Sequence, residues 1–452
     1  MSHPRTDPGH PLTRAALPLA LLLAAAAVRA DAPPAKADKD EPRVVVAKSL
    51  APAGTLLRRA AAGKPWEVVE PKGDVFSRDL LLSMPLSQAT VEAKGGAVRL
   101  LFWGNLPQIS PFPILESAVV LHEAKGTDLD LSPQRGRVVL SNAREKGAAR
   151  VRVRLPSGTW DVTLFEPGTE VALEVYGRWP RGVPFQADPE SADSPTISVE
   201  LVVLKGGAEL KADDRQFTLG PAPGPAYFHW DSGVGNAAGP RRLAEPPQWT
   251  SKKLLETSEA KAALAVLEEV ASRVQSKAPE TVLAGLSREA DAEKDPVKAG
   301  ILRRGAVYGS AALDNLGPVV GALADKPADV RDAAVQALRA WIGRGPGQDR
   351  KLYDYLLKEE KFSKAHAAIA LQMLHSHGDA DLERPETYEV LIAYLRHERP
   401  AIRELAAWHL QRLVPAGKDI PYDPTASREE LNRAYKEWKK LVPDGKLPPK
   451  EK

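Results

Sequence analysis

The chain of 452 residues contains no cysteine, which removes a whole group of chemistries. Disulfides, cysteine-ligated zinc, iron–sulfur clusters, thiol catalysis and a lipidated N-terminal cysteine are all excluded. A clear excess of one charge is also missing, because 62 lysines and arginines face 59 aspartates and glutamates, a net charge of +3. Since a nucleic-acid-binding protein would carry an excess of basic residues on one face, we expect no nucleic-acid partner.

The common catalytic motifs are missing as well. The sequence holds no G-x-S-x-G, no H-E-x-x-H and no P-loop. The glycines of Gly233-Val-Gly-Asn-Ala-Ala-Gly239 have the wrong spacing for a dinucleotide fingerprint and precede Pro240. Paired carboxylates occur at Asp128 with Asp130 and at Glu190 with Asp193, but no nucleophile or second catalytic group lies near them in sequence. We therefore expect a protein that is not an enzyme and needs no cofactor.

One cluster of metal-type ligands is present, in His375-Ser-His377-Gly-Asp379-Ala-Asp381. Two imidazoles and two carboxylates could bind zinc or another divalent cation. The cluster also stands where a helix is expected to end at Gly378, so a polar turn between helices is the more ordinary interpretation. The sequence alone leaves open whether His375 and His377 bind a metal.

The N-terminus has the layout of an export signal. Arg5 and Arg14 precede an apolar run over residues 15–28, and small residues before Ala30 predict cleavage after Ala30. The run of 14 residues is short for the roughly 20 residues that span a bilayer. Since no later segment is apolar enough to span, we expect an exported protein, periplasmic or secreted, with no membrane span after cleavage. Residues 31–65, which begin with a stretch rich in Pro, Ala and Lys, are expected to form a linker.

A β domain is expected over residues 66–250. Arg150 to Leu155 alternates polar and apolar residues, as a strand with one buried face does. Turn signals such as Gly95-Gly96 and Gly206-Gly207 separate the candidate strands. Many short strands with regular turns are typical of a sandwich, a roll or a β-solenoid-like stack. The further strand candidates are residues 91–102, 137–140, 160–165, 171–176 and 197–204.

Four segments of this region resemble a FecR-type β domain over about residues 80–225. They are Arg135-Gly-Arg-Val-Val-Leu140, Pro156-Ser-Gly-Thr-Trp-Asp-Val162, Glu166-Pro-Gly-Thr-Glu-Val171 and Ile197-Ser-Val-Glu-Leu-Val-Val-Leu-Lys-Gly-Gly207. In that family a G-x-V strand leads to a hairpin, a Gly-Thr strand and a V-x-x-G strand. Sensory members carry a cytoplasmic helical region and a membrane span before this domain. This chain has neither, so the resemblance implies an all-β fold without implying a signalling role.

Residues 251–445 are expected to be helical. Strong helix formers recur at helical spacing over residues 258–274, and loops such as Gly343-Arg-Gly-Pro-Gly347 contain Pro or Gly. Ser427 and Glu430 form the pattern of a capping box for the last helix. The other helices are expected around 279–290, 296–312, 315–324, 328–342, 350–358, 364–376, 386–396, 400–413 and 427–441.

Two parts of the helical region match each other 72 positions apart (402 − 330), which is about two periods of a 30–50-residue repeat. The matched pairs are Leu323 with Leu395, Val330 with Ile402, Arg331 with Arg403, Ala334 with Ala406 and Leu338 with Leu410. The pattern of Asp325, Val330-Arg331 and two alanines resembles a HEAT repeat. In that family the Asp and Arg hold adjacent repeats together and the alanines let helices approach closely, although the second copy has His397 in place of Asp325.

The expected fold class is therefore multidomain α+β, with an N-terminal all-β, FecR-like domain and a C-terminal α-solenoid of HEAT-like repeats. Because repeats need such ties to stack, we expect a structural role for the matched residues. These repeat-stacking residues are Asp325, Val330, Arg331, Ala334, Leu338, Ile402, Arg403, Ala406 and Leu410.

Two hypotheses for function follow. The first is a non-enzymatic exported scaffold whose helical surface binds another protein or a cell-envelope component. The second is an exported enzyme or glycan-binding protein with a site in the β domain, near residues 180–195 and the aromatic cluster Tyr227-Phe228-His229-Trp230-Asp231. Such a cluster more often closes a core than binds a sugar, which favours the scaffold.

Overall fold

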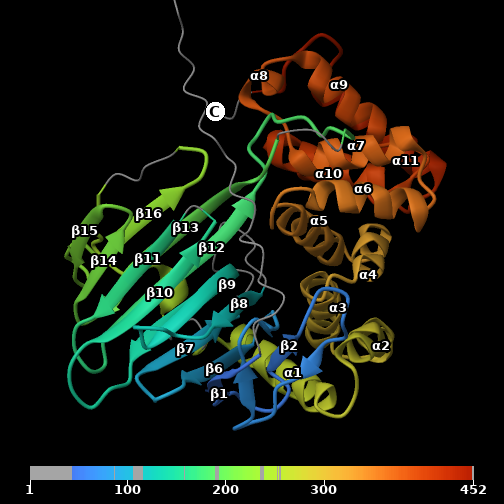
Figure 1. Ribbon diagram of the computed structural model, residues 1–452. Coiled ribbons are helices and arrows are strands. Elements are labelled where there is room, and N and C mark those ends of the chain that lie inside the picture. Colours follow the sequence, from blue (N-terminus) through green and yellow to red (C-terminus); the bar gives the residue numbers. More distant parts are fainter. Residues whose placement is uncertain are drawn as a thin grey trace, which may run out of the picture. The chain divides into compact units, whose positions relative to one another are not determined.

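The computed structural model describes residues 43–85, 87–104, 116–156, 158–188, 193–234, 239–251, 253 and 256–449. Strands occupy the part from Val45 to Asp231, and α-helices follow from Ser258 to Leu441, as the α+β fold class predicted (Figure 1). The expected export signal with Ala30, and also Glu190, lie outside the described residues. Residues Glu41–Lys452 form one compact unit that includes both the β and the helical region.

One long strand, β9 (Leu129–Asn142), joins the described strands into two hydrogen-bonded layers. The first layer has the order β4-β1-β6-β7-β9-β12-β13-β16 and the second β3-β2-β5-β8-β9-β10-β11-β14-β15. Neighbouring strands are antiparallel except β9 and β10, which are parallel. The other first-layer strands are β4 (Asp74–Phe76), β1 (Val45–Ser49), β6 (Gln88–Ala93), β7 (Val98–Trp103), β12 (Glu170–Arg178), β13 (Thr196–Lys205) and β16 (Tyr227–Asp231). Those of the second layer are β3 (Glu67–Val68), β2 (Leu56–Arg59), β5 (Leu80–Ser83), β8 (Ser117–His122), β10 (Ala149–Leu155), β11 (Gly158–Leu164), β14 (Ala208–Ala212) and β15 (Arg215–Leu219).

Strand β9 changes layer at Gly136. Residues before it pair with β8 and β10, and residues from Gly136 on pair with β7 and β12. Gly136 has a φ of 91°, and a Cβ at this position would lie 2.2 Å from the carbonyl oxygen of Glu116. Only glycine fits this backbone at low cost. The bend places Arg135 and Arg137, its two neighbours in sequence, in different surroundings.

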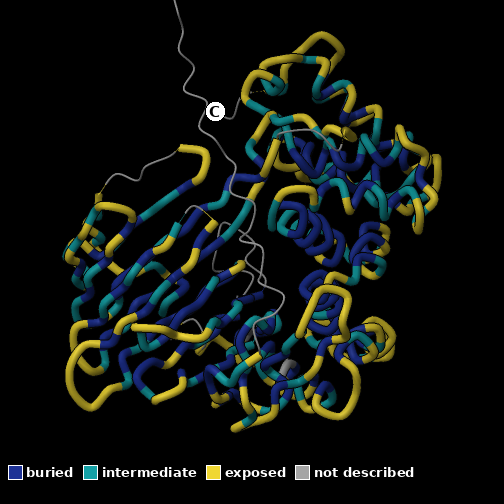
Figure 2. Tube along the Cα trace, in the orientation of Figure 1, coloured by how far each residue is buried: buried dark blue, intermediate teal, exposed yellow. Residues whose placement is uncertain are grey.

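The core of the β region lies between the two layers. Strand β10 alternates buried and more exposed positions along its whole length, which confirms the alternation expected for residues 150–155. Its inward side chains Val151 and Val153 join Val171 and Leu173 of β12 in one apolar cluster. Of the three expected architectures, a two-layered sandwich is the one found here. Figure 2 shows the buried stretches running along the strands, with exposed residues at the turns.

Two expectations for the β region are wrong. The segment expected as a linker, residues 31–65, contains β1 and β2, so the strands begin at Val45 and not near residue 66. Strands β1 and β2 are short, and their partners β4, β5 and β6 lie further along the chain. Their sequences therefore show little local periodicity. Residues 91–102 were expected as one strand but form the β6–β7 hairpin, which turns at Gly95 and Gly96, both with positive φ.

The helices match their expected positions closely. The capping box is confirmed, because Ser427 accepts from the backbone of Glu430 and the Glu430 carboxylate accepts from Ser427. One short helix, α8 (Asp379–Leu382), was not expected. The other α-helices are α1 (Ser258–Val274), α2 (Pro279–Ala292), α3 (Pro296–Ala312), α4 (Leu316–Gly321), α5 (Ala328–Ile342), α6 (Gln348–Lys358), α7 (Lys364–His375), α9 (Pro385–Tyr394), α10 (Pro400–Leu413) and α11 (Arg428–Leu441). The 3₁₀ turns are η1 (Gln248–Thr250), η3 (Ala322–Ala324) and η4 (Pro415–Gly417).

The β region and the helices share an apolar cluster. Leu57, Trp66 and Leu82 from the strand region pack with residues of α1, α2 and α3 such as Val270 and Leu286. The Pro-rich sequence Glu245-Pro-Pro-Gln248 and the change to helical spacing after it predict two separable folding units with a boundary near residues 245–257. The cluster crosses that boundary, so the two regions share part of one core, and their separate folding stays a prediction. Among the described helices, none has both the length and the apolar character needed to cross a membrane.

Candidate functional site

The two matched arginines make the same backbone contacts. Arg331 Nη1 donates to the carbonyl oxygens of Asp325 (2.9 Å) and Lys326 (2.6 Å), and Arg403 Nη1 donates to those of His397 (2.7 Å) and Glu398 (3.4 Å). Each guanidinium therefore holds the turn that precedes its own helix. The HEAT resemblance implied a tie through the Asp325 side chain. The contact is instead made by the backbone carbonyl, so His397 can stand at the same position without loss.

Each matched arginine also contacts a segment further along the chain. Arg331 Nε donates to Glu404 Oε2 of α10 at 2.8 Å, and Arg403 Nε donates to the carbonyl oxygen of Pro424 at 2.6 Å. Burial raises the pKa of Glu404, although the charge of Arg331 opposes this. The remaining repeat-stacking residues are all buried in one apolar cluster: Val330, Ala334, Leu338, Ile402, Ala406 and Leu410. These contacts are those of a structural tie, with no group free for chemistry.

A middle copy of the repeat lies between the two matched ones. Helix α7 begins 36 residues after α5 (364 − 328) and 36 before α10 (400 − 364). Ala370 and Leu374 occupy the small and large apolar positions and are buried. Ala367 stands where the arginine would be, and the carbonyl oxygen of Lys361 accepts instead from Arg399 Nη2 at 2.7 Å. The sequence comparison missed this copy because its arginine comes from the following unit.

The histidines of the possible metal cluster point to different partners. The buried His375 ring stacks on Trp179 with centroids 4.2 Å apart, and its Nε2 lies 3.3 Å from Asp349 Oδ2. The His377 ring lies 5.1 Å from that of His409. Over the described residues, no three His, Asp or Glu side chains are placed to hold a metal ion. His375 serves to dock the connection between β12 and β13 onto α6 and α7.

The two carboxylate pairs noted in the sequence also have ordinary partners where they are described. Asp128 accepts from the backbone of Arg150 and pairs with Arg144, and Asp130 accepts from both ends of the Arg154 guanidinium. Asp193, the described member of the second pair, bonds Gln186. These carboxylates lie in hairpins and strand edges of the β region and do not converge.

The aromatic cluster of residues 227–231 is divided between two faces of β16. Phe228 is buried in the core, where its ring meets that of Trp160 edge to face with centroids 5.3 Å apart, and Trp230 packs on the same core. Tyr227 and His229 lie on the opposite face, as alternation in a strand requires. Phe228 and Trp230 therefore close the core, as the favoured interpretation of the cluster predicted, and the aromatic residues do not share one surface.

On that opposite face, polar residues form a ladder across four strands. Arg137 of β9, Glu174 of β12, Glu200 of β13 and His229 of β16 are directly opposite one another in register. Arg137 Nε donates to Glu174 Oε2 at 2.5 Å, and the Tyr227 hydroxyl donates to Glu200 Oε1 at 2.9 Å. Burial raises the pKa of Glu174 and of Glu200, and the charge of Arg137 opposes both shifts.

Only Tyr227 and His229, at one end of this ladder, were candidate site residues in the sequence. Glu174 and Glu200 each lie within an otherwise apolar strand, Val171 to Tyr176 and Ile197 to Leu204. A single carboxylate inside an apolar strand is the signal that could have identified them, since a buried carboxylate needs a partner.

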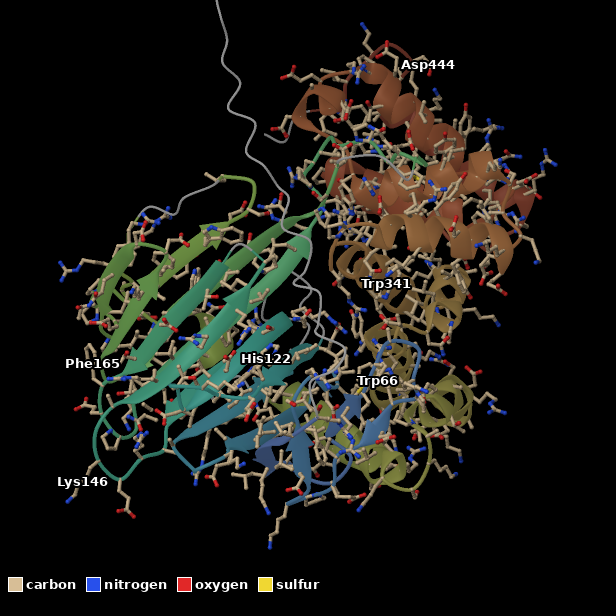
Figure 3. The ribbon with its side chains drawn as sticks, in the orientation of Figure 1. Trp66, His122, Lys146, Phe165, Trp341 and Asp444 are labelled. Carbon is tan, nitrogen blue, oxygen red and sulfur yellow. The ribbon has the colours of Figure 1, made fainter. Side chains whose placement is uncertain are left out.

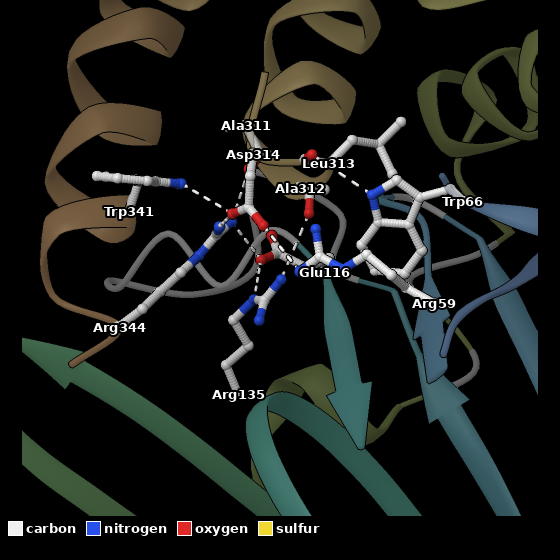
Figure 4. Close-up of polar contacts among 10 residues, drawn as sticks. All are labelled: Arg59, Trp66, Glu116, Arg135, Ala311, Ala312, Leu313, Asp314, Trp341 and Arg344. Atoms are coloured by element: carbon white, nitrogen blue, oxygen red, sulfur yellow. Dashed lines mark hydrogen bonds and ion pairs between the residues drawn. The ribbon is translucent and has the colours of Figure 1, made fainter. Parts of the chain in front are cut away.

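A second polar group, the junction cluster, lies where the β region meets the helices (Figure 4). We define it as Arg59, Glu116, Arg135, Asp314 and Arg344. Glu116 is only 3% exposed and accepts from Arg135 Nε and from Arg344 Nη2, the latter at 2.5 Å. Asp314 accepts from Arg344 Nη1 at 2.9 Å and from Arg59 Nη2 at 3.0 Å. Every charged group in this cluster has an opposite charge as a partner.

The junction cluster also closes the C-terminal end of α3. The carbonyl oxygens of Ala311, Ala312 and Leu313 accept from Arg344, Arg135 and Trp66 respectively. Positive charge at this end of a helix is favourable. Burial acts to raise the pKa of Glu116, but the charges of Arg344 and Arg135 outweigh it and hold the pKa of Glu116 below its usual range. The cluster is a structural tie between the two regions.

A third group, the helix-face cluster, consists of Asp332 and Arg339 of α5, Trp408 and Arg412 of α10, and Arg181 of the connection after β12. The guanidinium carbons of Arg339 and Arg412 lie 5.2 and 4.0 Å from the centre of the Trp408 ring. Asp332 accepts from Trp408 Nε1 at 2.8 Å and from Arg412 Nη2 at 2.5 Å. Burial lowers the pKa of Arg339 to about 10, and the charges of Arg181 and Arg412 add to the shift.

Two cavities in the described part of the chain lie along helices. One of about 380 Å³ is bounded by the loop at residues 420–426 and α11, with Tyr422, Asp423, Glu430 and Arg433 in its wall. Another of about 230 Å³ lies between α1 and the start of α3. The carboxylates of Asp423 and Glu430 are already used by Thr425 and Ser427 in local turns. Space for a ligand is therefore offered by the helical region.

Comparison of the chain with known protein families, with curated proteins and with solved structures finds no match. The arguments on function below therefore rest on the geometry of these clusters.

Proposed function

We propose that the protein is an exported, non-enzymatic scaffold in which the helical region binds another protein or a cell-envelope component. The observation that carries this proposal is the helix-face cluster. Trp408 is half-buried and bears two guanidiniums on its ring, and the side chain of Arg412 is 43% exposed. Tryptophan and arginine are the residue types that most often dominate the binding energy of protein interfaces.

We also propose that the helical region is a solenoid of HEAT-like repeats, which would present this cluster on a continuous surface. The 36-residue spacing of α5, α7 and α10 supports the proposal, and so do the contacts that Arg331 and Arg399 make with other units. Stacked repeats bury a core between neighbours and leave extended faces for partners. A FecR-like fold for the β region remains a proposal on the sequence resemblance alone.

The proposal is tested by changing Trp408→Ala in the mature protein and measuring recovery of partners from envelope extract. We expect the loss of an interface tryptophan to reduce recovery of a specific partner by about tenfold or more. Phe165→Ala is the matched control, because Phe165 is an exposed aromatic residue of the β region (Figure 3). Equal recovery of the partner by both variants would contradict binding through the helix-face cluster.

Export is a separate part of the proposal. Deleting the first 30 residues should leave the protein in the cytoplasm. Recovery of the truncated protein outside the cytoplasm in normal amounts would contradict it.

A second candidate, a glycan-binding protein or enzyme of the β region, is favoured by the polar ladder. Glu174 and Glu200 are carboxylates in directly opposite positions, and Tyr227 and His229 lie beside them. Carboxylates of raised pKa are the groups that general acid catalysis uses. Binding of envelope polysaccharide that is lost in Glu200→Gln and retained in Trp408→Ala would favour this candidate over the scaffold.

A further inference from the structure

The helix-face cluster has more positive charge than its own carboxylate can balance. The positive charges of Arg181 and Arg412 both act on Arg339, the guanidiniums of Arg339 and Arg412 share the Trp408 ring, and Asp332 is the carboxylate bonded within the cluster. Among the described residues, neither Arg339 nor Arg181 forms an ion pair. Since buried charges in proteins are normally paired, this excess requires an explanation.

The remaining contacts of Arg339 do not supply the missing charge. Its Nη1 donates to the carbonyl oxygen of Leu374 at 2.7 Å, and its guanidinium lies against Trp408. Asp332 accepts from Trp408, Arg412 and Gln336, and among the described residues no hydrogen bond or ion pair joins it to Arg339. The nearby His377 has a buried Nε2 atom without a hydrogen-bond partner among the described residues. Burial lowers the pKa of His377, so it is a neutral group.

The cluster is also assembled from separate parts of the chain. Arg181 comes from the connection after β12, Arg339 from α5, and Trp408 with Arg412 from α10. The connection is held in place by two contacts. The backbone at Gly182 lies directly against Gly378, and the carbonyl oxygen of Val183 lies 3.2 Å from His375 Nδ1. Arg181 and Arg412 are exposed, so the positive charge can be reached from solvent. A preorganised, accessible set of guanidiniums matches the way proteins bind oxyanions.

We propose that the helix-face cluster binds a phosphate group, either free phosphate or a phosphate monoester, through Arg181, Arg339 and Arg412. Three guanidiniums and one carboxylate leave two positive charges, which a phosphate dianion balances and a single carboxylate does not. The proposal deepens the proposed scaffold function, on which it rests, by naming the chemical group that a partner would present there.

The experiment titrates inorganic phosphate into the mature protein in a phosphate-free buffer of constant ionic strength and follows binding by calorimetry. Saturable binding is expected. Arg339→Gln and Arg181→Gln should each weaken it by about tenfold or more, the loss of a charge-assisted contact. Arg181 is exposed, so its variant tests the site even if Arg339→Gln fails to fold. Arg396→Gln is the matched control, because Arg396 lies over the Tyr435 ring at 3.6 Å outside the cluster and should leave binding unchanged.

The source of the phosphate is distinguished by two further arms, glycerol 3-phosphate and vesicles that contain phosphatidic acid. Binding in any arm that Arg181→Gln weakens supports the site and assigns its source. Binding by no arm, or binding that Arg181→Gln and Arg339→Gln leave unchanged, overturns the inference. The two proposals fail separately. Partner recovery that Trp408→Ala abolishes while phosphate does not bind leaves the scaffold standing, and phosphate binding without any loss of partner recovery leaves only the anion site.

Discussion

Two clusters in this protein each contain three arginines, but they differ in how many of the guanidiniums are paired with carboxylates. The junction cluster sets Arg59, Arg135 and Arg344 against two carboxylates and the terminal carbonyls of α3. The helix-face cluster sets its three arginines against Asp332, which is already shared with Trp408. The difference separates a structural role from a binding role. A buried charge that is fully paired holds elements together, whereas one left in excess has capacity for a ligand.

Removing the charge at the centre of the junction cluster should have the largest effect. Glu116→Gln leaves Arg135 without a carboxylate and Arg344 with Asp314 alone, in a buried setting, so the free energy of unfolding should fall by about 3–5 kcal/mol. Denaturant unfolding followed by separate probes of sheet and helix measures it, with the exposed Glu123→Gln as the control. We expect both probes to shift together. A shift of the helical probe alone would support separate folding of the two regions.

Overpacking the repeat should have the next largest effect. Ala334 is fully buried in α5, so Ala334→Trp should cost roughly 1–3 kcal/mol or more. If the helical region is a stacked solenoid as proposed, the damage should stay mostly in the helices that pack around α5, which include α10. Ala328→Trp, at the exposed start of the same helix, is the control. If thermal unfolding of Ala334→Trp equals that of the parent, the repeat register described above is wrong.

The positive charge of the helix-face cluster should also be visible in the pH dependence of stability. Burial lowers the pKa of His409 to about 3, and His377, Arg339 and Arg412 add to the shift while the bond to Met373 opposes it. Because the folded pKa is depressed, the stabilising effect of neutral His409 is present above about pH 6.5 and is lost as pH falls toward the folded pKa. The slope is about 1.4 kcal/mol per pH unit.

His409→Gln should remove that slope. Unfolding free energies of parent and variant, measured at several pH values below about 6.5, should converge as the pH falls. Parallel curves would show that His409 does not take up its proton on unfolding.

The smallest effect on stability should come from replacing Arg339. The contrast with the same replacement of Arg344 tests the difference between the two clusters most directly. Arg344→Leu strands Glu116 and Asp314, so it should cost about 3–5 kcal/mol. Arg339→Leu removes an unpaired charge and keeps the packing on Trp408, so in phosphate-free buffer it should change stability by no more than about 1 kcal/mol. Comparable losses in the two variants, measured by denaturant unfolding, would mean that Arg339 is also a structural tie.

The helices could be predicted from the sequence because their determinants are local. Residues 328–342 were expected as a helix and form α5 with those bounds, and the capping box at Ser427 and Glu430 is formed. A helix closes its hydrogen bonds within four residues and shows its buried face at a period of 3.6. The strands β1 to β5 gave no such signal, since each depends on partners that the sequence does not mark.

The contacts of the candidate sites could likewise be predicted only where the partners are close together in sequence. The roles of Arg331 and Arg403 were expected from the repeat, but their partners Glu404 and Pro424 were not. The junction cluster was not expected at all, because Glu116 and Arg344 are 228 positions apart in sequence. His375 was a possible metal ligand in the sequence, and its actual contact, Trp179, comes from the connection after β12, far away in sequence.

The sequence by itself determined the order of a β region and a helical region, the helix boundaries and the residues that face the helical core. Only the tertiary structure decided which charges meet. Arg135 and Arg137 are equivalent in sequence, yet the bend at Gly136 sends one to the junction cluster and the other to the ladder. Periodicity specifies which side of an element is buried, whereas pairing of charges depends on distances between elements that folding alone establishes.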